Sequence, residues 1–240
     1  MAIRTDDTGF KGYKLLQDTD AFCYGVDAVL LADYSRAEET EHILDLGSGN
    51  GAVPIVLMGK FNPASVTGIE VQPAMAELAS KSAELNGLSD RVKFICGDVK
   101  DIKNLVEGGS FDVVTCNPPY FESGRGPASS ASAAFVARHE TTAKLMDFVS
   151  AAAYALRRGG RFVLVHRPSR LPDIFECCRK CGLEPKKLRM VAPKDGESAN
   201  IVLVSCVKGG GKELKIDPQL SVHTQDGGYT EEIERIYERI

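Results

Sequence analysis

The stretch Asp45-Leu46-Gly47-Ser48-Gly49-Asn50-Gly51 is a glycine-rich turn between a strand-like and a helix-like segment. The apolar run Ile43–Leu46 is typical of a short buried strand, and Ala52–Met58 is typical of a helix. Glycines in such a turn adopt positive φ angles and let a ligand approach the backbone closely. The spacing is GxGxG, whereas dinucleotide-binding turns have GxGxxG. The turn therefore predicts a ligand site, but one that does not suit NAD or FAD.

Strand-like and helix-like segments alternate along the rest of the chain. The expected strands are Ser65–Glu70, Arg91–Ile95, Phe111–Cys116, Arg161–Val165, Lys187–Val191 and Asn200–Val207. The expected helices are Pro73–Asn86, Glu140–Leu156, Ser169–Cys181 and part of Tyr229–Ile240. This alternation predicts an α/β fold with a doubly wound, mostly parallel sheet in a three-layer, Rossmann-like sandwich. Ligands of such sheets bind beyond the carboxyl ends of the strands, where the strand order reverses.

The composition is that of a globular protein of one large domain. The chain has 240 residues, 43% of them hydrophobic, and a net charge of −4. No apolar run approaches the roughly 20 residues that a membrane helix needs. Charged side chains occupy the N-terminal residues where a secretory signal would be apolar. We therefore expect a cytoplasmic protein without membrane association.

The seven cysteines are scattered and lie mostly inside apolar runs, as reduced core thiols do. Cys178 and Cys181 form a CxxC pair, which occurs in some metal sites. Because no second CxxC or HxxxH completes such a site, we expect no bound metal.

Basic residues are concentrated in one part of this acidic chain. Between Tyr154 and Lys215 there are 14 basic residues and six acidic ones. This asymmetry is typical of a surface that contacts phosphates, and equally of a solvated surface with many ion pairs. The charge pattern alone leaves both interpretations open.

Acidic residues follow the two strands after the glycine turn. Glu70 lies 23 residues after Gly47, where a carboxylate can accept hydrogen bonds from both hydroxyls of a ribose. It could instead stabilise the N-terminus of the next helix. Asp98 follows the next expected strand and could accept from an adenine amino group, or simply be a turn residue.

The motif Asn117-Pro118-Pro119-Tyr120 follows the expected strand Phe111–Cys116, and Phe121 adds a second aromatic ring. The Asn117 side-chain oxygen and the Pro118 carbonyl can accept the two hydrogens of a planar amine. The prolines restrict φ and hold these acceptors in place. Tyr120 can stack on the flat face of a base. A proline turn without chemistry is the alternative, which the preceding glycine turn and spaced acids make less attractive.

Together, Asp45–Gly51, Glu70, Asp98 and Asn117–Tyr120 resemble the class I S-adenosylmethionine (SAM)-dependent methyltransferases. The resemblance covers about His42 to Val207 and implies a seven-stranded sheet whose last strand is antiparallel. It implies that the catalytic residues are Asn117, Pro118, Pro119 and Tyr120. It implies that the cofactor-binding residues are Asp27, Asp45, Gly47, Gly49, Asn50, Gly51, Glu70, Val71, Asp98, Val99 and Asn117. Residues 1–41 are then an N-terminal extension packed on the cofactor site, and residues 42–240 form the methyltransferase domain.

Four segments narrow the resemblance to the bacterial tRNA(Val) adenine-N6 methyltransferases. They are Tyr24–Leu31, Thr115–Phe121, Ala137–Glu140 and Val165–Pro168, with one departure at Val26, where that family commonly has threonine or serine. The resemblance implies methylation of the exocyclic N6 amine of the purine 3′ of the anticodon. The expected RNA-contacting residues are Tyr120, Phe121, Arg138, His139, Arg167 and Arg170. Solvated loop charge is the alternative for the arginines, and a capped surface helix is the alternative for Arg138 and His139.

The sequence leaves other substrates open. Methylation of an rRNA base, of a protein glutamine or of DNA adenine would use the same motif, although the last two usually need a further domain. A binder without turnover or a nicotinamide enzyme fits the motifs poorly. Residues 122–137 are rich in Gly, Ser and Ala and are expected to form a mobile lid. The C-terminal helix could pack on the domain or form a dimer contact, so we expect a monomer or a homodimer.

Overall fold

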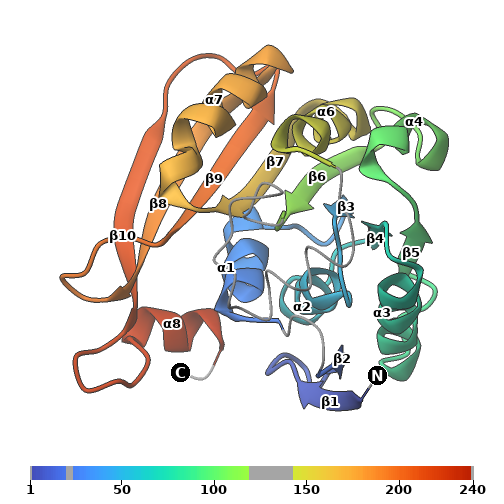
Figure 1. The fold of residues 1–240 in the computed structure, drawn as a ribbon, viewed down its shortest axis with the longest axis horizontal. Coiled ribbons are helices and arrows are strands. Elements are labelled where there is room, and N and C mark those ends of the chain that lie inside the picture. The colour runs from blue at the N-terminus through green and yellow to red at the C-terminus, as the bar shows by residue number, and fades with distance from the viewer. Residues whose placement is uncertain (1, 20–23, 119–142, 239–240) are drawn as a thin grey trace.

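The computed structural model describes residues 2–19, 24–118 and 143–238. Its centre is one eight-stranded sheet with helices around it (Figure 1). The strands are β3 (His42–Leu46), β4 (Ser65–Glu70), β5 (Val92–Cys96), β6 (Phe111–Cys116), β7 (Leu156–His166), β8 (Leu183–Lys194), β9 (Ile201–Lys208) and β10 (Lys215–His223). Their spatial order is β10-β8-β9-β7-β6-β3-β4-β5. All pairs are parallel except those of β9, which is antiparallel to β7 and β8. The predicted mostly parallel sheet is confirmed.

The number of strands differs from the seven that the resemblance implied. The antiparallel strand is β9, and the chain then adds β10 at the sheet edge, parallel to β8. The sequence of β10 gives little strand signal because an edge strand buries few side chains. Of its nine residues only Leu220 and Val222 are buried, while Ile216 is 67% exposed.

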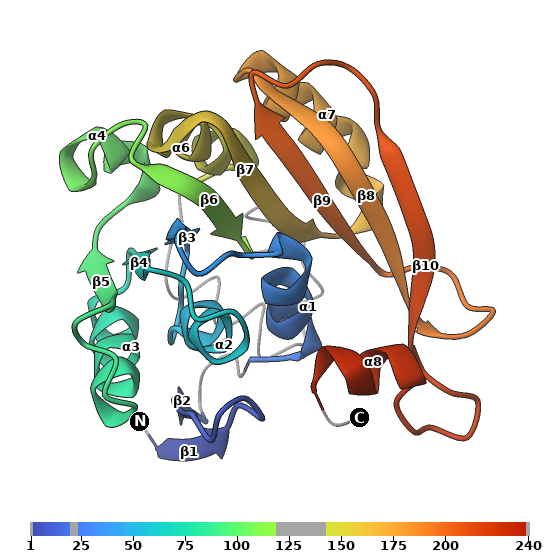
Figure 2. The ribbon, with the colours of Figure 1, turned by 180° about the vertical axis from the view of Figure 1, so that it is seen from behind.

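Helices cover both faces of the sheet, as the doubly wound fold requires (Figures 1 and 2). One face carries α1 (Val26–Ser35), α2 (Ala52–Lys60) and α3 (Pro73–Leu85), and the other carries α4 (Ile102–Leu105), α6 (Leu145–Ala155) and α7 (Leu171–Lys180). Helix α1 contacts β6, β7 and β9. Neighbouring strand residues enter opposite cores, Val113 with α1 and α2, and Val114 with α6 and α7. The predicted three-layer sandwich is confirmed.

Strand β7 begins earlier than the sequence indicates. Glu140–Leu156 was expected to be a helix that ends before Gly159-Gly160, but α6 ends at Ala155 and β7 starts at Leu156. The pairing of β6 with β7 shifts register between Phe111 and Val113. A Cβ at Gly160 would lie 2.9 Å from the carbonyl oxygen of Asp112, so a glycine permits this irregular pairing.

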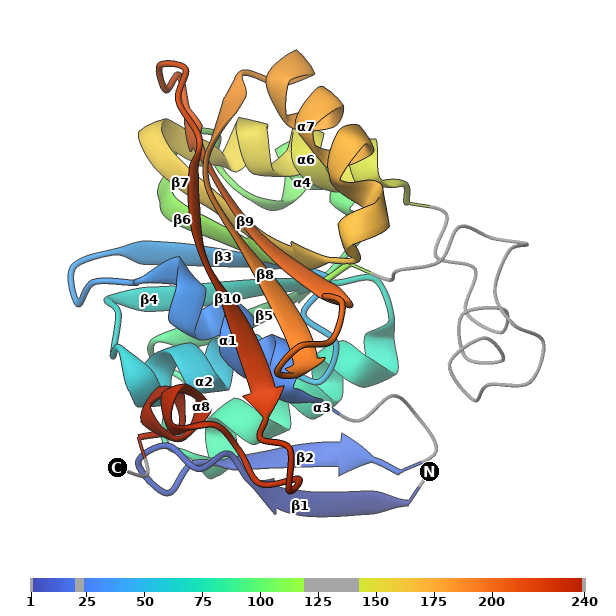
Figure 3. The ribbon, with the colours of Figure 1, turned by 90° about the vertical axis from the view of Figure 1, so that its left-hand side faces the viewer.

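An antiparallel hairpin of β1 (Ile3–Asp7) and β2 (Lys14–Asp18) lies outside α3 (Figure 3). Asn86 joins it to the end of that helix, because its Oδ1 accepts from Lys14 N and its Nδ2 donates to Lys14 O, both at 2.7 Å. The Ser82 hydroxyl accepts from Leu16 N (3.1 Å). This hairpin was not predicted from the sequence.

The C-terminal helix α8 (Glu231–Ile236) packs on α1 rather than presenting an apolar face. Ile233, Ile236 and Tyr237 are buried, and Thr230 caps the helix by accepting from Ile233 N. Packing within the domain was one of the two predictions for this segment. In the described residues, no helix has the length and apolar character needed to cross a membrane.

The strand order reverses between β3 and β6. From β3 the chain proceeds through β4 to β5 at one edge, and then returns to β6 on the other side of β3. Leu46 and Cys116, the last residues of β3 and β6, are direct partners in the ladder. The glycine turn and Asn117 therefore begin side by side, at the position where doubly wound sheets bind ligands.

Candidate active site

The glycine turn is anchored to the neighbouring strand. Gly47 N and Ser48 N both donate to the carbonyl oxygen of Ile69 in β4, at 2.9 and 3.0 Å. Gly47, Gly49 and Gly51 have φ of 73°, 55° and 84°, a left-handed region that suits glycine. A Cβ at Gly51 would lie 2.7 Å from the Phe94 ring, whereas a Cβ at Gly49 would meet nothing within 4 Å. The turn is therefore packed at Gly51 and borders open space at Gly49.

Glu70 fixes the same turn from the end of β4. Its Oε2 accepts from Gly49 N and its Oε1 accepts from Gln72 N, both at 2.9 Å, and the residue is 5% exposed. A carboxylate has about four lone-pair positions, and these two bonds leave it able to accept from a diol. Gln72 is the N-cap of α3, so the alternative helix-terminus role is compatible with the same geometry.

Two apolar residues and an acid continue this edge of the sheet. Val71 is 43% exposed, which is unusual for valine, whereas Val99 is buried. Asp98 accepts from Lys100 N (2.9 Å) and pairs with Lys100 Nζ (3.3 Å). Gly97 N donates to Glu70 O (2.9 Å), which joins the segments after β4 and β5. Asp98 thus has the turn role that the sequence left open, and its carboxylate stands at the carboxyl edge.

Asp45 is a buried carboxylate at the point of strand reversal. It is 1% exposed, and its Oδ1 accepts from the Thr115 hydroxyl (2.6 Å). Burial raises the pKa of Asp45 to about 6, although hydrogen bonds from Thr115 and Ser48 oppose that rise. Thr115 was not predicted to have a role in the site. Its position opposite Asp45 in the β3–β6 register is a tertiary feature that a single sequence does not contain.

Asn117 directly follows β6 and contacts α1. Its Nδ2 donates to Asp27 Oδ2 at 3.1 Å, and Asp27 is 9% exposed in the first turn of α1. Asn50 of the glycine turn donates through Nδ2 to Leu16 O of β2 (3.3 Å). Asp27, Asn50 and Asn117 therefore connect the N-terminal extension to the carboxyl edge of the sheet.

Part of the expected site lies outside the described residues. Pro118 is buried next to Asn117. Pro119, Tyr120, Phe121, Arg138 and His139 fall within 119–142, as does the expected lid, and remain predictions.

The last residue of β7 is a buried histidine that was not among the predicted site residues. His166 is 3% exposed, and its Nδ1 accepts from Arg167 N (2.8 Å). Burial, helped by the positive charges of Arg170 and Arg167, lowers the pKa of His166 to about 4. Arg170 Nε donates to Asp173 Oδ2 (2.6 Å). Arg167 and Arg170 thus follow the strand that lies next to β6, and His166 is a neutral side chain at neutral pH.

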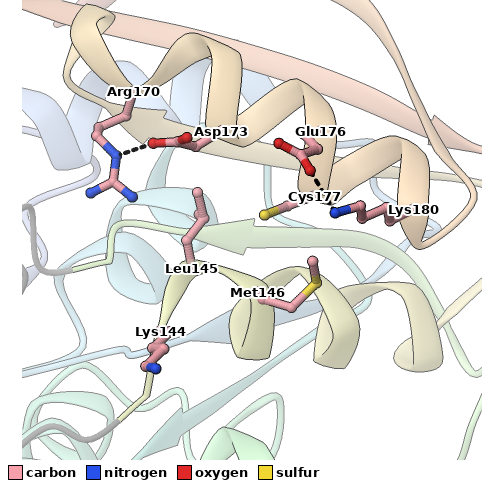
Figure 4. A pocket seen from close by; sticks show the side chains of 8 residues that line it. All are labelled: Lys144, Leu145, Met146, Arg170, Asp173, Glu176, Cys177 and Lys180. Carbon is pink, nitrogen blue, oxygen red and sulfur yellow. Dashed lines mark hydrogen bonds and ion pairs between the residues drawn. The ribbon is translucent and has the colours of Figure 1, made fainter.

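A pocket of about 220 Å³ lies between the start of α6 and α7 (Figure 4). Its lining includes two ion pairs, Arg170 with Asp173 and Lys180 with Glu176, and also Lys144. None of the expected cofactor-binding residues lines it. This pocket is therefore separate from the glycine turn and shares with the expected site only Arg170.

Of the 14 basic residues between positions 154 and 215, seven form ion pairs within the part of the chain that the structure describes. These pairs are Arg157–Asp112, Arg161–Glu41, Arg170–Asp173, Arg179–Glu184, Lys180–Glu176, Arg189–Glu232 and Lys215–Asp217. The interpretation of this segment as an ion-paired surface accounts for these seven. Arg167 is a candidate for RNA contact because it directly follows the carboxyl end of β7.

The cysteines of the CxxC pair point to different surroundings. Cys178 is buried in the core with Cys206, whereas Cys181 lies 3.8 Å from the Met146 sulfur. Among the residues that the structure describes, no group of three or more His, Cys, Asp or Glu side chains is arranged to hold a metal ion.

Comparison with known proteins identifies the family. A methyltransferase-domain model matches residues 37–180. A Porphyromonas gingivalis tRNA1(Val) (adenine(37)-N6)-methyltransferase is 33% identical over 71% of this chain and 68% of its own length. A protein of the same name from Bacteroides fragilis is 26% identical over 92% of both chains.

Solved structures give the same fold. A predicted O-methyltransferase from Agrobacterium tumefaciens superposes with a TM-score of 0.72 at 23% identity, covering 88% of this chain and 95% of that one. A geranyl diphosphate methyltransferase solved with SAM covers 76% of this chain and 84% of its own, with a TM-score of 0.57 at 17% identity. The glycine turn, Glu70 and Asn117 lie together where the strand order reverses, in agreement with these similarities. The chain therefore belongs to the methyltransferases, in the family of the bacterial tRNA1(Val) (adenine-N6)-methyltransferases.

Proposed function

We propose that this enzyme transfers a methyl group from SAM to N6 of an adenine in tRNA, at position 37 of tRNA1(Val), 3′ of the anticodon. The relatives named above carry this activity in their names. The structural observation that carries the proposal is the pairing of Leu46 with Cys116 in the sheet. It puts the glycine turn and Asn117 at adjacent strand ends, so a methyl donor on one and an amine on the other would meet.

The residues around the glycine turn fit the parts of SAM. Glu70 has acceptor capacity left for the ribose hydroxyls. Exposed Val71 and buried Val99, which follow β4 and β5, would offer an apolar surface for the adenine ring. Asp98 would accept from the adenine amino group. The open space at Gly49 would admit the methionine part, with Asp45, Gly47, Asn50 and Gly51 around it. When bound, SAM supplies a methyl group on a positively charged sulfur.

Asn117 and Pro118 would hold the target amine. The Asn117 Oδ1 and the Pro118 carbonyl accept the two N–H groups of N6 and turn the nitrogen lone pair toward the methyl group. The new N–C bond replaces the S–C bond, and one N6 proton leaves to solvent afterwards. Positioning and acceptor dipoles account for such a reaction without a strong general base.

RNA would approach the same edge of the sheet. Arg167 and Arg170 follow β7 and would contact phosphates next to the target nucleotide. Tyr120 and Phe121 would stack on the adenine, and Arg138 and His139 would contact phosphate or base. A tRNA substrate also favours the cytoplasm as the location of the enzyme.

The first test is methyl transfer from labelled SAM to total tRNA of a strain that lacks this activity. We expect N6-methyladenosine in the digested product by mass spectrometry, and sequencing is expected to find it at position 37 of tRNA1(Val). Transfer to rRNA or to a release factor instead would overturn the substrate. A calorimetric titration with SAM that gives no binding signal would overturn the reaction class.

Asn117→Ala tests the amine site directly. We expect turnover to fall by about 10²-fold or more while the SAM dissociation constant changes less than about threefold, because the lost acceptor serves the reacting amine. Asn104→Ala, at an exposed position of α4, is the matched control and is expected to leave both quantities unchanged. An equal loss of SAM affinity in Asn117→Ala would contradict this role.

A further inference from the structure

The amide of Asn117 has a defined orientation because of the group that faces it. Its side chain lies 3.1 Å from Asp27 Oδ2, a residue 90 positions earlier in the chain. An ionised carboxylate has no hydrogen to donate and can only accept. The atom of the Asn117 amide that faces Asp27 is therefore the nitrogen and not the oxygen. The amide is planar, so its oxygen Oδ1 is directed away from Asp27.

This orientation decides whether Asn117 helps or hinders N-methylation. With Oδ1 toward the target amine, the side chain accepts an N6 hydrogen and leaves the nitrogen lone pair available. A flipped amide would present its own N–H groups to the amine. It would oppose the N6 hydrogens and donate to the lone pair that must attack the methyl group. A single rotation of the amide thus separates a productive site from an unproductive one.

The backbone just before Asp27 is held in place by a contact with β2. Gln17 of β2 is 2% exposed, and its Oε1 accepts from Tyr24 N at 2.8 Å. Gly25 follows as the N-cap of α1, where a Cβ would lie 3.0 Å from Asp27 Oδ1. Asp27 itself lies in the first turn of α1. These contacts hold the backbone next to Asp27 in the position from which its carboxylate accepts from Asn117.

We propose that Asp27 is a positioning residue that holds the Asn117 amide with its oxygen toward the target amine. The proposal rests on the proposed function and deepens it. It assigns Asp27 to the amine side of the reaction, whereas the family resemblance had placed it with the cofactor.

A double-mutant cycle of Asp27→Ala and Asn117→Ala tests the assignment. We expect Asp27→Ala to lower the single-turnover rate about 10- to 100-fold, with less than about a threefold change in SAM affinity or in KM for tRNA. The double variant is expected to be no slower than Asn117→Ala. Asp27→Asn should fall between wild type and Asp27→Ala, because an asparagine can accept from Asn117 but can also turn and donate to it.

Asp33→Asn is the control for general damage to α1. Asp33 lies in the same helix, is also buried, and pairs with Lys60 Nζ (3.3 Å) rather than with Asn117. We expect it to lower the melting temperature without lowering the single-turnover rate. SAM affinity that falls in proportion to the rate in Asp27→Ala, or rate losses that multiply in the double variant, would overturn the proposal.

The side-chain amide signals of Asn117 give a readout without catalysis. In ¹⁵N-labelled protein these signals are identified by their loss in Asn117→Ala. We expect them to move in Asp27→Ala and to stay in place in Asp33→Asn; signals unmoved in Asp27→Ala would overturn the contact. If wild-type enzyme fails on tRNA but methylates another amine, the proposed substrate is wrong, and the cycle measured on that amine still decides the role of Asp27.

Discussion

Two buried titratable residues at the carboxyl edge of the sheet are shifted toward their neutral forms. Asp45 has its pKa raised to about 6 and His166 has its pKa lowered to about 4, in both cases mainly because burial disfavours charge. Asp45 stands by the glycine turn at the end of β3, and His166 ends β7. Their contributions to stability therefore change with pH in opposite directions over a shared range.

Asp45→Asn is expected to stabilise the cofactor-free protein at pH 7.5 by about 1–3 kcal/mol. The folded pKa of Asp45, about 6, lies above its ordinary value of 3.8. Its stabilising contribution is thus complete below pH 4 and lost as pH rises through 6. Urea unfolding from pH 4 to 8 measures the difference between variant and wild type. A difference that does not shrink toward pH 4 would contradict the assigned cause.

His166→Asn is expected to show the reverse dependence. The folded pKa of about 4 lies below the ordinary value of 6.5, so the stability contribution is complete above pH 6.5 and lost as pH falls through 4. Asparagine keeps an acceptor for Arg167 N but does not titrate. The same urea titration should show that the variant loses less stability than wild type between pH 6.5 and 4. An equal loss in both proteins would show that His166 does not cause it.

The strands differ in how well they could be predicted from the sequence. β3, β4 and β6 are largely buried and rich in apolar or β-branched residues, and the predicted and observed bounds of β4 and β6 agree. β1 and β10 were missed because they are largely exposed, and β2 because it is short and carries mixed polar residues. The glycine turn, Glu70 and Asn117 were found from spacing. The Thr115–Asp45 and Asn117–Asp27 contacts were not, because pairing across the fold has no local sequence signal.

The hairpin of β1 and β2 is joined to the glycine turn as well as to α3. Asn86→Ala is expected to lower the free energy of unfolding by about 1–2 kcal/mol, because it removes both hydrogen bonds to Lys14. Amide exchange should accelerate in β2 more than in the central sheet. Ser80→Ala, which removes only a bond within α3, is the control and should change stability by less than about 0.5 kcal/mol. Equal exchange rates in wild type and Asn86→Ala would show that the hairpin is held by other contacts.

At the scale of the whole molecule, the acidic net charge and an RNA substrate are compatible if the cations that contact RNA gather at one edge. Two arginines at opposite ends of β7 form a matched pair: Arg167 directly follows its carboxyl end, and Arg158 lies near its amino end. Because both residues are arginines, comparing their variants separates the effect of position from the effect of charge.

Arg167→Ala is expected to weaken tRNA binding and to reduce the slope of log K against log salt by about one, as the loss of one phosphate contact does. Arg158→Ala should leave both quantities near wild type. Filter binding from 50 to 300 mM salt measures the slopes. Equal slopes in the two variants would place the RNA elsewhere on the surface.

The contacts of α1 with β6, β7 and β9 also bear on how the protein is made. This helix leaves the ribosome before every strand of the large sheet, and Leu203 of β9, which shares its core, follows roughly 170 residues later. At bacterial rates of about 5–20 residues per second, the apolar side chains of α1 wait on the order of ten seconds or more for their last partners. The nascent chain is therefore a natural client for chaperones that shield apolar helices during translation.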